Sequence, residues 1–278
     1  KLGIRERRVA QNELPSDMGL AAAQQAITAA GIDKEDLGMI IVATSSPEQI
    51  SPATACVIHH KLGIRKNVPA FDINAVCSGF LYAVSLAANL VSSGACNHIL
   101  VVATEAYSKI TNWRDQHCVF FGDGAGAVIV SRSKTGWLIF SLEANGAGTG
   151  MTGFKLPLNS VFTMRGKEVW DQAVKVLPES IKQVLNESGL GIADIKLVIP
   201  HQPSVHILKQ VAAQLDCPFS KVKTIMDRYA NVAGASVPIA LDEAVRMRQI
   251  RHGDTIVLSA IGSGWTWGSM VVKYEEAT

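Results

Sequence analysis

The chain contains an internal repeat, and this repeat limits the possible folds more than any other feature. Residues 24–45 read QQAITAAGIDKEDLGMIIVATS, and residues 182–203 read KQVLNESGLGIADIKLVIPHQP. Each segment predicts an amphipathic helix, a glycine that ends it, an acidic linker and a strand rich in β-branched residues. Gly31 of the first segment corresponds to Gly189 of the second. We therefore expect a chain built from two copies of one unit.

The similarity extends beyond these two segments. In each copy a Gly- and Ala-rich helix start follows, at Cys77 in the first and at Asn231 in the second. A helix, a strand, a Gly-x-Gly sequence and a last strand complete each copy. We expect two pseudo-symmetric β-α-β-α-β-β halves, residues 1–135 and 136–278. The corresponding strands are expected at 99–103 and 127–130 in the first half, and at 255–259 and 269–272 in the second.

Strands that alternate with helices predict an α/β fold with largely parallel sheets and helices on their faces. The stretch 73–104, which includes the helix after Cys77, has no Asp, Glu, Lys or Arg, and the second such helix starts with small residues at 233–236. We expect both helices to lie buried between the halves. Because polar residues interrupt 73–104 and it ends in a β-type run, we interpret it as buried structure and not as a membrane span.

The composition narrows the possible functions. With 278 residues and 48% apolar composition, the chain can bury a sizeable core. Its net charge of +2 and the lack of basic runs mixed with aromatic residues argue against nucleic acid or a membrane surface as a partner.

The five cysteines are an odd number without a Cys-x-x-Cys pair, which fits neither a disulfide framework nor a zinc ribbon. A reducing, cytoplasmic setting is the simpler interpretation. The charged run at residues 1–8 does not resemble a secretory signal. His59 and His60 are adjacent on an expected helix, and no Cys, Asp or Glu completes a ligand set, so no metal site is expected.

Three polar residues occupy equivalent positions in the repeat. Cys77 follows the expected strand 70–73, His201 follows the expected strand 196–199, and Asn231 follows a strand expected near 222–226. In open α/β sheets, ligands bind beyond the carboxyl ends of the strands. We therefore expect these three side chains to converge on one cleft.

Each of the three also has a simpler interpretation. A buried cysteine usually packs as a small hydrophobe, a histidine after a strand usually bonds within its loop, and an asparagine before a helix is usually its cap. Chemistry is the alternative. A thiol at a helix N-terminus favours the thiolate, and an imidazole or amide N–H can donate to a developing oxyanion. Taken alone, the residues favour the simpler interpretations.

Two Gly-x-Gly sequences resemble each other. Gly122-Asp123-Gly124 lacks the Lys-Ser/Thr of a phosphate loop and precedes a strand, so we predict a tight turn between two strands. Gly262-Ser263-Gly264 is similar, and its backbone N–H groups are candidates for an oxyanion hole.

Eight segments together carry a family pattern. The chain resembles the β-ketoacyl-acyl carrier protein synthase III family of the thiolase superfamily, over nearly its whole length and in family order. The resemblance implies a thiolase-like fold with layers in the order α-β-α-β-α. The segments are GIRERRVA (3–10), SPATACVIHHKLG (51–63), FDINAVCSGFLYAV (71–84), FGDGAGAVIV (121–130), MRGKEVW (164–170), IPHQPSVHIL (199–208), ANVAGASVPIALDEAV (230–245) and IGSGWTWGSMVV (261–272).

The resemblance also implies a mechanism. The family's Cys–His–Asn triad falls on Cys77, His201 and Asn231, and its backbone oxyanion donors fall on Cys77 and Ser263. It implies a homodimer in which an acyl-CoA acylates Cys77 and a malonyl thioester then loses carbon dioxide and condenses with the acyl group. No cofactor or metal is implied beyond the thioester substrates. The substrate-binding positions implied are Lys1, Arg5, Phe162, Met164, Ser204 and Gly234.

Several positions depart from the family pattern. Lys1 replaces an Arg near the CoA nucleotide, Ser204 an Asn and His206 an Arg, while Asp171 stands where a basic carrier-docking residue is common. The malonyl group is therefore expected on either acyl carrier protein or CoA. Family members also carry a sheet strand ahead of the GIRER motif and a longer loop after Asn145. Either the first half lacks a counterpart of the strand at 137–142, or the given sequence omits residues of the first half.

Two other functions remain open. One is an acyltransferase of the same fold that passes the acyl group to an oxygen or nitrogen nucleophile. The other is a non-catalytic, acyl-binding partner subunit. Retention of Asn231 favours decarboxylation over simple transfer, and an intact triad argues against the non-catalytic subunit.

Overall fold

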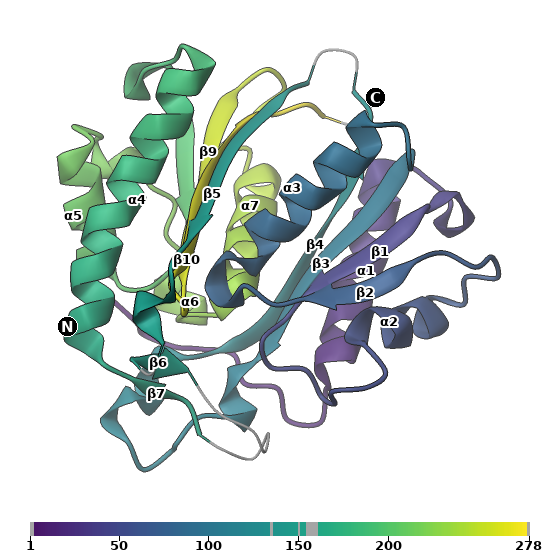
Figure 1. Ribbon diagram of the computed structural model, residues 1–278, viewed down its shortest axis with the longest axis horizontal. Coiled ribbons are helices and arrows are strands. Elements are labelled where there is room, and N and C mark those ends of the chain that lie inside the picture. Colours follow the sequence, from purple (N-terminus) through teal and green to yellow (C-terminus); the bar gives the residue numbers. More distant parts are fainter. Residues whose placement is uncertain (1–2, 134–135, 150, 154–160, 277–278) are drawn as a thin grey trace.

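The computed structural model describes residues 3–133, 136–149, 151–153 and 161–276 and has five layers (Figure 1). Two four-stranded sheets enclose a central pair of helices, and further helices cover the outer face of each sheet. The expected order of layers, α-β-α-β-α, is therefore confirmed. No helix among the described residues is long and apolar enough to cross a membrane.

The first sheet has the strand order β2-β1-β3-β4. β1, β2 and β3 are parallel, with Ile40 of β1 paired with Ala70 and Leu100, and β4 runs antiparallel to β3. Helices on both faces bury β1 and β3, which explains their continuous apolar sequence. The elements are α1 (Pro15–Ala30), β1 (Met39–Ala43), α2 (Thr54–Leu62), β2 (Ala70–Ile73), α3 (Gly79–Ser92), β3 (His98–Ala106) and β4 (Asp123–Ser131).

The second sheet has the order β5-β10-β9-β8. β8 and β9 are parallel, β9 and β10 form an antiparallel hairpin, and β10 also pairs antiparallel with β5. α4 and α5 pack on its outer face. The elements are β5 (Leu138–Ala144), β6 (Thr152–Gly153), β7 (Thr163–Met164), α4 (Gly166–Ser188), β8 (Leu197–Pro200), α5 (Val205–Gln214), α6 (Met226–Tyr229), α7 (Ser236–Arg246), β9 (Thr255–Gly262) and β10 (Thr266–Lys273).

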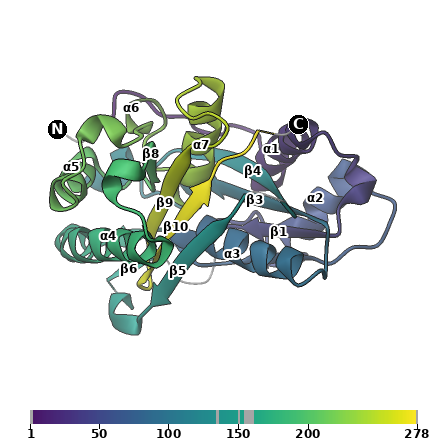
Figure 2. The same cartoon turned by 90° about the horizontal axis from the view of Figure 1, so that it is seen from above.

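The middle layer consists of α3 and α7, which both lie between the sheets in the view from above (Figure 2). One buried apolar cluster joins residues of both helices to strands of both sheets, from Phe80 and Ala87 of α3 to Val237 and Ala244 of α7. An uncharged α3 therefore fits this place between the sheets, where most of its residues are buried. β4 ends at Ser131 and β5 begins at Leu138, so we propose that residues 1–135 and 136–278 are the two halves.

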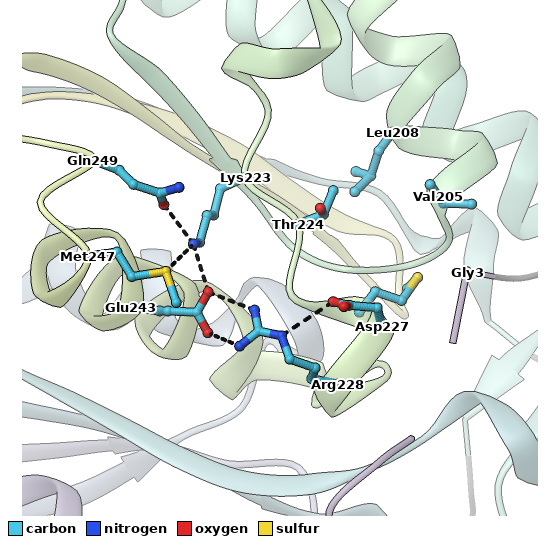
Figure 3. A pocket seen from close by; sticks show the side chains of 11 residues that line it. Gly3, Val205, Leu208, Lys223, Thr224, Asp227, Arg228, Glu243, Met247 and Gln249 are labelled. Atoms are coloured by element: carbon cyan, nitrogen blue, oxygen red, sulfur yellow. Dashed lines mark hydrogen bonds and ion pairs between the residues drawn. The ribbon is translucent and has the colours of Figure 1, made fainter. Parts of the chain in front are cut away.

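The predicted strand near 222–226 is wrong. Only Val222 makes an isolated parallel bridge, to Val198, and residues 226–229 form the short helix α6. The Nζ of the next residue, Lys223, lies 2.7 Å from both Glu243 Oε1 and Gln249 Oε1 (Figure 3). The backbone N–H of Lys223 still donates to Val198 O of β8 at 2.8 Å, and the chain turns into α6 three residues later.

The first sheet has no counterpart of β5 in the part of the chain that the structure describes. Among the described residues, β4 pairs only with β3. The shortened loop expected after Asn145 lies partly in residues 150 and 154–160, outside the described residues.

The tight turn predicted at Gly122-Asp123-Gly124 is wrong as well. Asp123 and Gly124 begin β4, and two short 3₁₀ helices, Tyr107–Lys109 and Gln116–Phe120, separate it from β3. Gly124 and the nearby Gly126 instead allow β4 to approach α7 closely. A Cβ on Gly126 would lie 2.8 Å from Pro238 Cβ and 3.0 Å from the backbone N of Ile239.

We expect Gly126→Ala to lower the free energy of unfolding by about 1–3 kcal/mol, because the added methyl group would overpack the contact between β4 and α7. The measurement is the midpoint of urea unfolding. Gly146→Ala is the matched control, since a Cβ there meets no atom within 4 Å. Equal midpoints for the two variants would contradict this account of Gly126.

Candidate active site

A cavity of about 250 Å³ opens where the two halves meet. Cys77, His201 and Asn231 all line it, and they come respectively from the turn after β2, the loop after β8 and the segment after α6. The rings of Tyr107, Phe121 and Phe162 form an aromatic wall beside them, with centroid separations of 5.0–5.6 Å. The structure thus brings the three predicted side chains into one cleft.

Cys77 lies in the 3₁₀ turn Val76–Ser78 that leads into α3. The turn is fixed from behind by the β9–β10 hairpin, because the Oγ of Ser78 donates to Thr266 Oγ1 at 2.7 Å. A Cβ on Gly262 would lie 2.7 Å from the carbonyl oxygen of Ala75 and 2.9 Å from the Cys77 nitrogen. Only glycine therefore allows the end of β9 to support the Cys77 turn so closely.

The protonation state of Cys77 differs from the expectation for a helix start. Burial raises the pKa of the Cys77 thiol well above its usual value, and the nearby negative charge of Glu105 raises it further. Burial therefore outweighs the favourable backbone contribution that motivated the expected thiolate. Cys77 is a protonated thiol in the empty cavity, and it needs a base to become a nucleophile.

His201 is oriented by α7. Its Nδ1 lies 2.8 Å from the Oγ of Ser236, and that hydroxyl in turn donates to the carbonyl oxygen of Ala233. Since the single hydroxyl proton is used in this way, Ser236 accepts from Nδ1–H, and the neutral ring has its lone pair on Nε2. Burial lowers the pKa of His201 to about 4, so the ring is neutral near pH 7. The neutral ring can therefore accept a proton at Nε2, whereas the sequence suggested only a donor.

Asn231 is held by its own backbone neighbours. Its side-chain Oδ1 accepts from the N–H of Ala233 at 2.8 Å, which is a local turn and not the expected helix cap, since Val232 is the cap of the 3₁₀ turn Ala233–Ala235. Its backbone N–H and C=O bond to Phe120 O and Gly122 N. Because Oδ1 is occupied, the Nδ2 group is the part of the amide that can donate to a ligand in the cavity.

The other expected residues fall into two groups. Phe162, Met164, Ser204 and Ser263 line the cavity, and the Oγ of Ser263 also donates to Thr152 O at 3.0 Å. Arg5 is exposed and does not line the cavity, Gly234 is buried beneath the Cys77 turn, and Lys1 lies outside the described residues.

Sequence reasoning missed several residues of the site. Tyr107 is fully buried and Trp265 nearly so, and both line the cavity, while Glu105 lies fully buried behind it. A glutamate within the apolar strand HILVVATEA was the one available signal, because such a residue is rarely buried without a specific partner.

A second hollow, of about 380 Å³, lies beside α6 and α7 (Figure 3). Its positive groups are already paired. Lys223 contacts Glu243, and the guanidinium of Arg228 contacts both oxygens of Glu243 at 2.7 and 2.8 Å. These contacts make this hollow a structural ion-pair cluster, whereas the triad lies in the smaller cavity.

Comparison with known proteins gives one consistent family. The family model described as 3-oxoacyl-[acyl-carrier-protein (ACP)] synthase III matches residues 71–146, and the model of its C-terminal part matches residues 185–274. A β-ketoacyl-[acyl-carrier-protein] synthase III of Thiobacillus denitrificans is 39% identical over 285 residues, covering 99% of this chain and 89% of the relative. One of Rhizorhabdus wittichii is 42% identical over 284 residues, with coverages of 99% and 89%.

Solved structures agree with the sequence relatives. The 3-oxoacyl-[acyl-carrier-protein] synthase III from Aquifex aeolicus VF5 superposes with a TM-score of 0.95 at 36% identity, covering 98% of this chain and 89% of that one. The priming β-ketosynthase from the R1128 polyketide biosynthetic pathway superposes with a TM-score of 0.92 at 30% identity, with coverages of 100% and 87%. On these matches and on its thiolase-like layers, the chain belongs to the 3-oxoacyl-[acyl-carrier-protein] synthase III family.

Proposed function

We propose that this protein catalyses the decarboxylative condensation of an acyl-CoA with a malonyl thioester to give a β-ketoacyl thioester. The observation that carries the proposal is the placement of Cys77, the Nε2 lone pair of His201 and the Nδ2 group of Asn231 around one cavity with an aromatic wall. The family membership and the names of the relatives support it.

The first half-reaction loads Cys77. His201 Nε2 takes the thiol proton, and the sulfur attacks the carbonyl carbon of the acyl-CoA. The oxyanion that forms accepts hydrogen bonds from the backbone N–H groups of Cys77 and Ser263. The bond between the carbonyl carbon and the CoA sulfur then breaks, and the departing thiolate takes the proton from His201.

The second half-reaction uses the malonyl thioester. Its carboxylate leaves as carbon dioxide, and the electron pair becomes an enolate whose oxygen accepts from Asn231 Nδ2–H. His201 can add a second hydrogen bond in its other neutral tautomer: Nδ1 gives its proton to solvent, Nε2 takes one from solvent, and the Ser236 hydroxyl turns to donate to Nδ1. The enolate carbon attacks the acyl-Cys77 carbonyl, the C–S bond breaks, and a proton from solvent restores the thiol.

The surroundings of the triad complete the proposal. Phe162, Met164 and Ser204 would contact the thioester substrates, Arg5 and Lys1 would lie toward the CoA nucleotide, and Gly234 would support the site from beneath. Acyl carrier protein or CoA would carry the malonyl group, and the enzyme would act as a homodimer. A cytoplasmic location is supported by the five free cysteines among the described residues.

The first test is the loading of Cys77. When the protein is mixed with a panel of acyl-CoA starters, we expect its intact mass to rise by one acyl group with at least one of them. Cys77→Ala should show no increase, whereas Cys56→Ala, which removes an exposed cysteine, should still be loaded. Equal loading of Cys77→Ala and the parent protein would refute Cys77 as the nucleophile.

The second test separates condensation from simple acyl transfer. Asn231→Ala should still be acylated on Cys77, but its release of carbon dioxide from the malonyl thioester should fall about 10²–10³-fold, because the enolate loses its amide donor. The measurement is carbon dioxide release by the acylated enzyme. A parent enzyme that is acylated yet releases no carbon dioxide from malonyl-CoA or malonyl-acyl carrier protein would favour transfer to an oxygen or nitrogen nucleophile.

The third test concerns His201. Because its pKa is lowered to about 4, the ring remains a neutral base as the pH falls through 6.5. The rate of Cys77 acylation should therefore show no loss centred at the usual histidine pKa. Ser236→Ala should slow acylation about tenfold or more, since Nδ1–H loses its acceptor and the ring its orientation.

Ser85→Ala is the control for Ser236→Ala, because Ser85 is also a buried helix serine bonded to a carbonyl oxygen, that of Tyr82. An acidic limb near pH 6.5 in the parent enzyme, or full acylation by Ser236→Ala, would contradict the role given to Nε2.

A further inference from the structure

Glu105 is a buried carboxylate that the two half-reactions do not use. It is the second-last residue of β3, its exposed fraction is 0%, and it does not line the cavity. Its partners come from the residues after β1 and from the segment that follows Asn231. A carboxylate is rarely buried in this way without a specific role.

Every group that faces the Glu105 carboxylate donates to it. The backbone N–H of Ser45 lies 3.2 Å from Oε2, and the hydroxyl of Ser45 lies 3.0 Å from Oε1. The hydroxyl of Ser46 lies 2.5 Å from Oε2 and itself accepts from the N–H of Ala106, so its proton is directed to Glu105. The backbone N–H of Gly234 adds a further donor. An ionised carboxylate satisfies all of these donors, whereas an amide in its place would not.

These bonds connect Glu105 to both catalytic segments. Gly234 follows Asn231 by three residues, and a Cβ on it would lie 3.0 Å from Val76 O and 3.2 Å from Glu105 Oε1. The Asn231 segment is therefore pressed between the Cys77 turn and the carboxylate. If Glu105 moved, Gly234 would lose this contact, and the position of Asn231 relative to Cys77 would change.

The same carboxylate acts on the cavity wall and on the nucleophile. Ser45 uses its proton toward Glu105, so it accepts from the hydroxyl of Tyr107 at 3.0 Å. Burial is the main cause that raises the pKa of both Cys77 and Tyr107, and the charge of Glu105 raises both further. Burial raises the pKa of Glu105 itself to about 7 against the effect of its donors, so the group is ionised in mildly alkaline solution.

We propose that Glu105 is a positioning residue of the condensing site: it fixes the Asn231 segment against the Cys77 turn, and its negative charge beside that turn adds to the effect of burial on the Cys77 thiol. The inference rests on the proposed roles of Cys77 and Asn231. An unreactive resting thiol protects the cavity from adventitious alkylation and oxidation, because the thiolate is the reactive form.

The experiment measures two quantities at pH 8 in the parent protein and in Glu105→Gln. The first is the rate at which iodoacetamide alkylates Cys77, followed by mass spectrometry of the Cys77 peptide. The second is the kcat of condensation with the starter that loads best. Removal of the charge should raise alkylation about tenfold for each unit by which the thiol pKa falls. The misplaced Asn231 segment should at the same time lower kcat about tenfold or more.

Opposite changes of the two rates identify the positioning role only if alkylation of the buried Cys217 stays at the parent rate, because a general loss of structure would expose both thiols. Asp123→Asn is the matched control. Asp123 is also a buried carboxylate, which accepts from the N–H and the hydroxyl of Ser108, and its charge is not among the causes that raise the Cys77 pKa. We expect Asp123→Asn to leave Cys77 alkylation within about twofold of the parent rate.

Glu105→Asp is a second variant for the same two measurements, and its result does not depend on whether Glu105→Gln folds. It keeps the charge but shortens the reach to Gly234, so alkylation should stay near the parent rate while kcat falls. Unchanged kcat in Glu105→Asp, or alkylation of Glu105→Gln no faster than that of the parent protein, would overturn the inference. The proposed function is tested separately by acyl loading of Cys77 and carbon dioxide release in the parent enzyme.

Discussion

The site depends on the close approach of two backbones at the centre of the molecule. Gly262 meets the Cys77 turn from the β9–β10 hairpin, and Gly234 meets it from the segment before α7. At both positions a side chain would collide with backbone atoms, which move only if the layers separate. The first half supplies Cys77 while the second supplies His201 and Asn231, so neither half holds the site alone.

The direction of hydrogen bonds, more than proximity, assigns the roles within the cavity. The N–H of Ala233 donates to Oδ1 of Asn231, so Nδ2 is the part of the amide that faces a ligand as a donor. Ser236 accepts a hydrogen bond from Nδ1–H of His201, so the lone pair of the ring lies on Nε2. Both partners belong to the short stretch at the start of α7. One segment therefore orients the base and the donor together, and it is the segment that contacts Glu105 through Gly234.

The sequence was sufficient to predict the layers and the meeting of the triad, because repeat, strand ends and helix starts are local patterns. It was not sufficient where a residue responds to distant neighbours. The strand expected near 222–226 is replaced by a bridge at Val222 and the helix α6, and Lys223 pairs with the distant Glu243. The thiolate expected at Cys77 is instead a thiol, since burial comes from packing across both halves. The partners of Glu105 are about 60 and more than 120 residues away along the chain.

The burial of both an acid and a base has a consequence for the pH dependence of folding. The pKa of Glu105 is raised from 4.5 to about 7, so the native state holds more protons than the unfolded chain between those values, and rising pH weakens folding. The pKa of His201 is lowered from 6.5 to about 4, so falling pH weakens folding over nearly the same interval. The two proton linkages oppose each other between about pH 4.5 and 6.5. The enzyme can therefore bury both groups behind and within one cavity without a steep change of stability in mildly acidic solution.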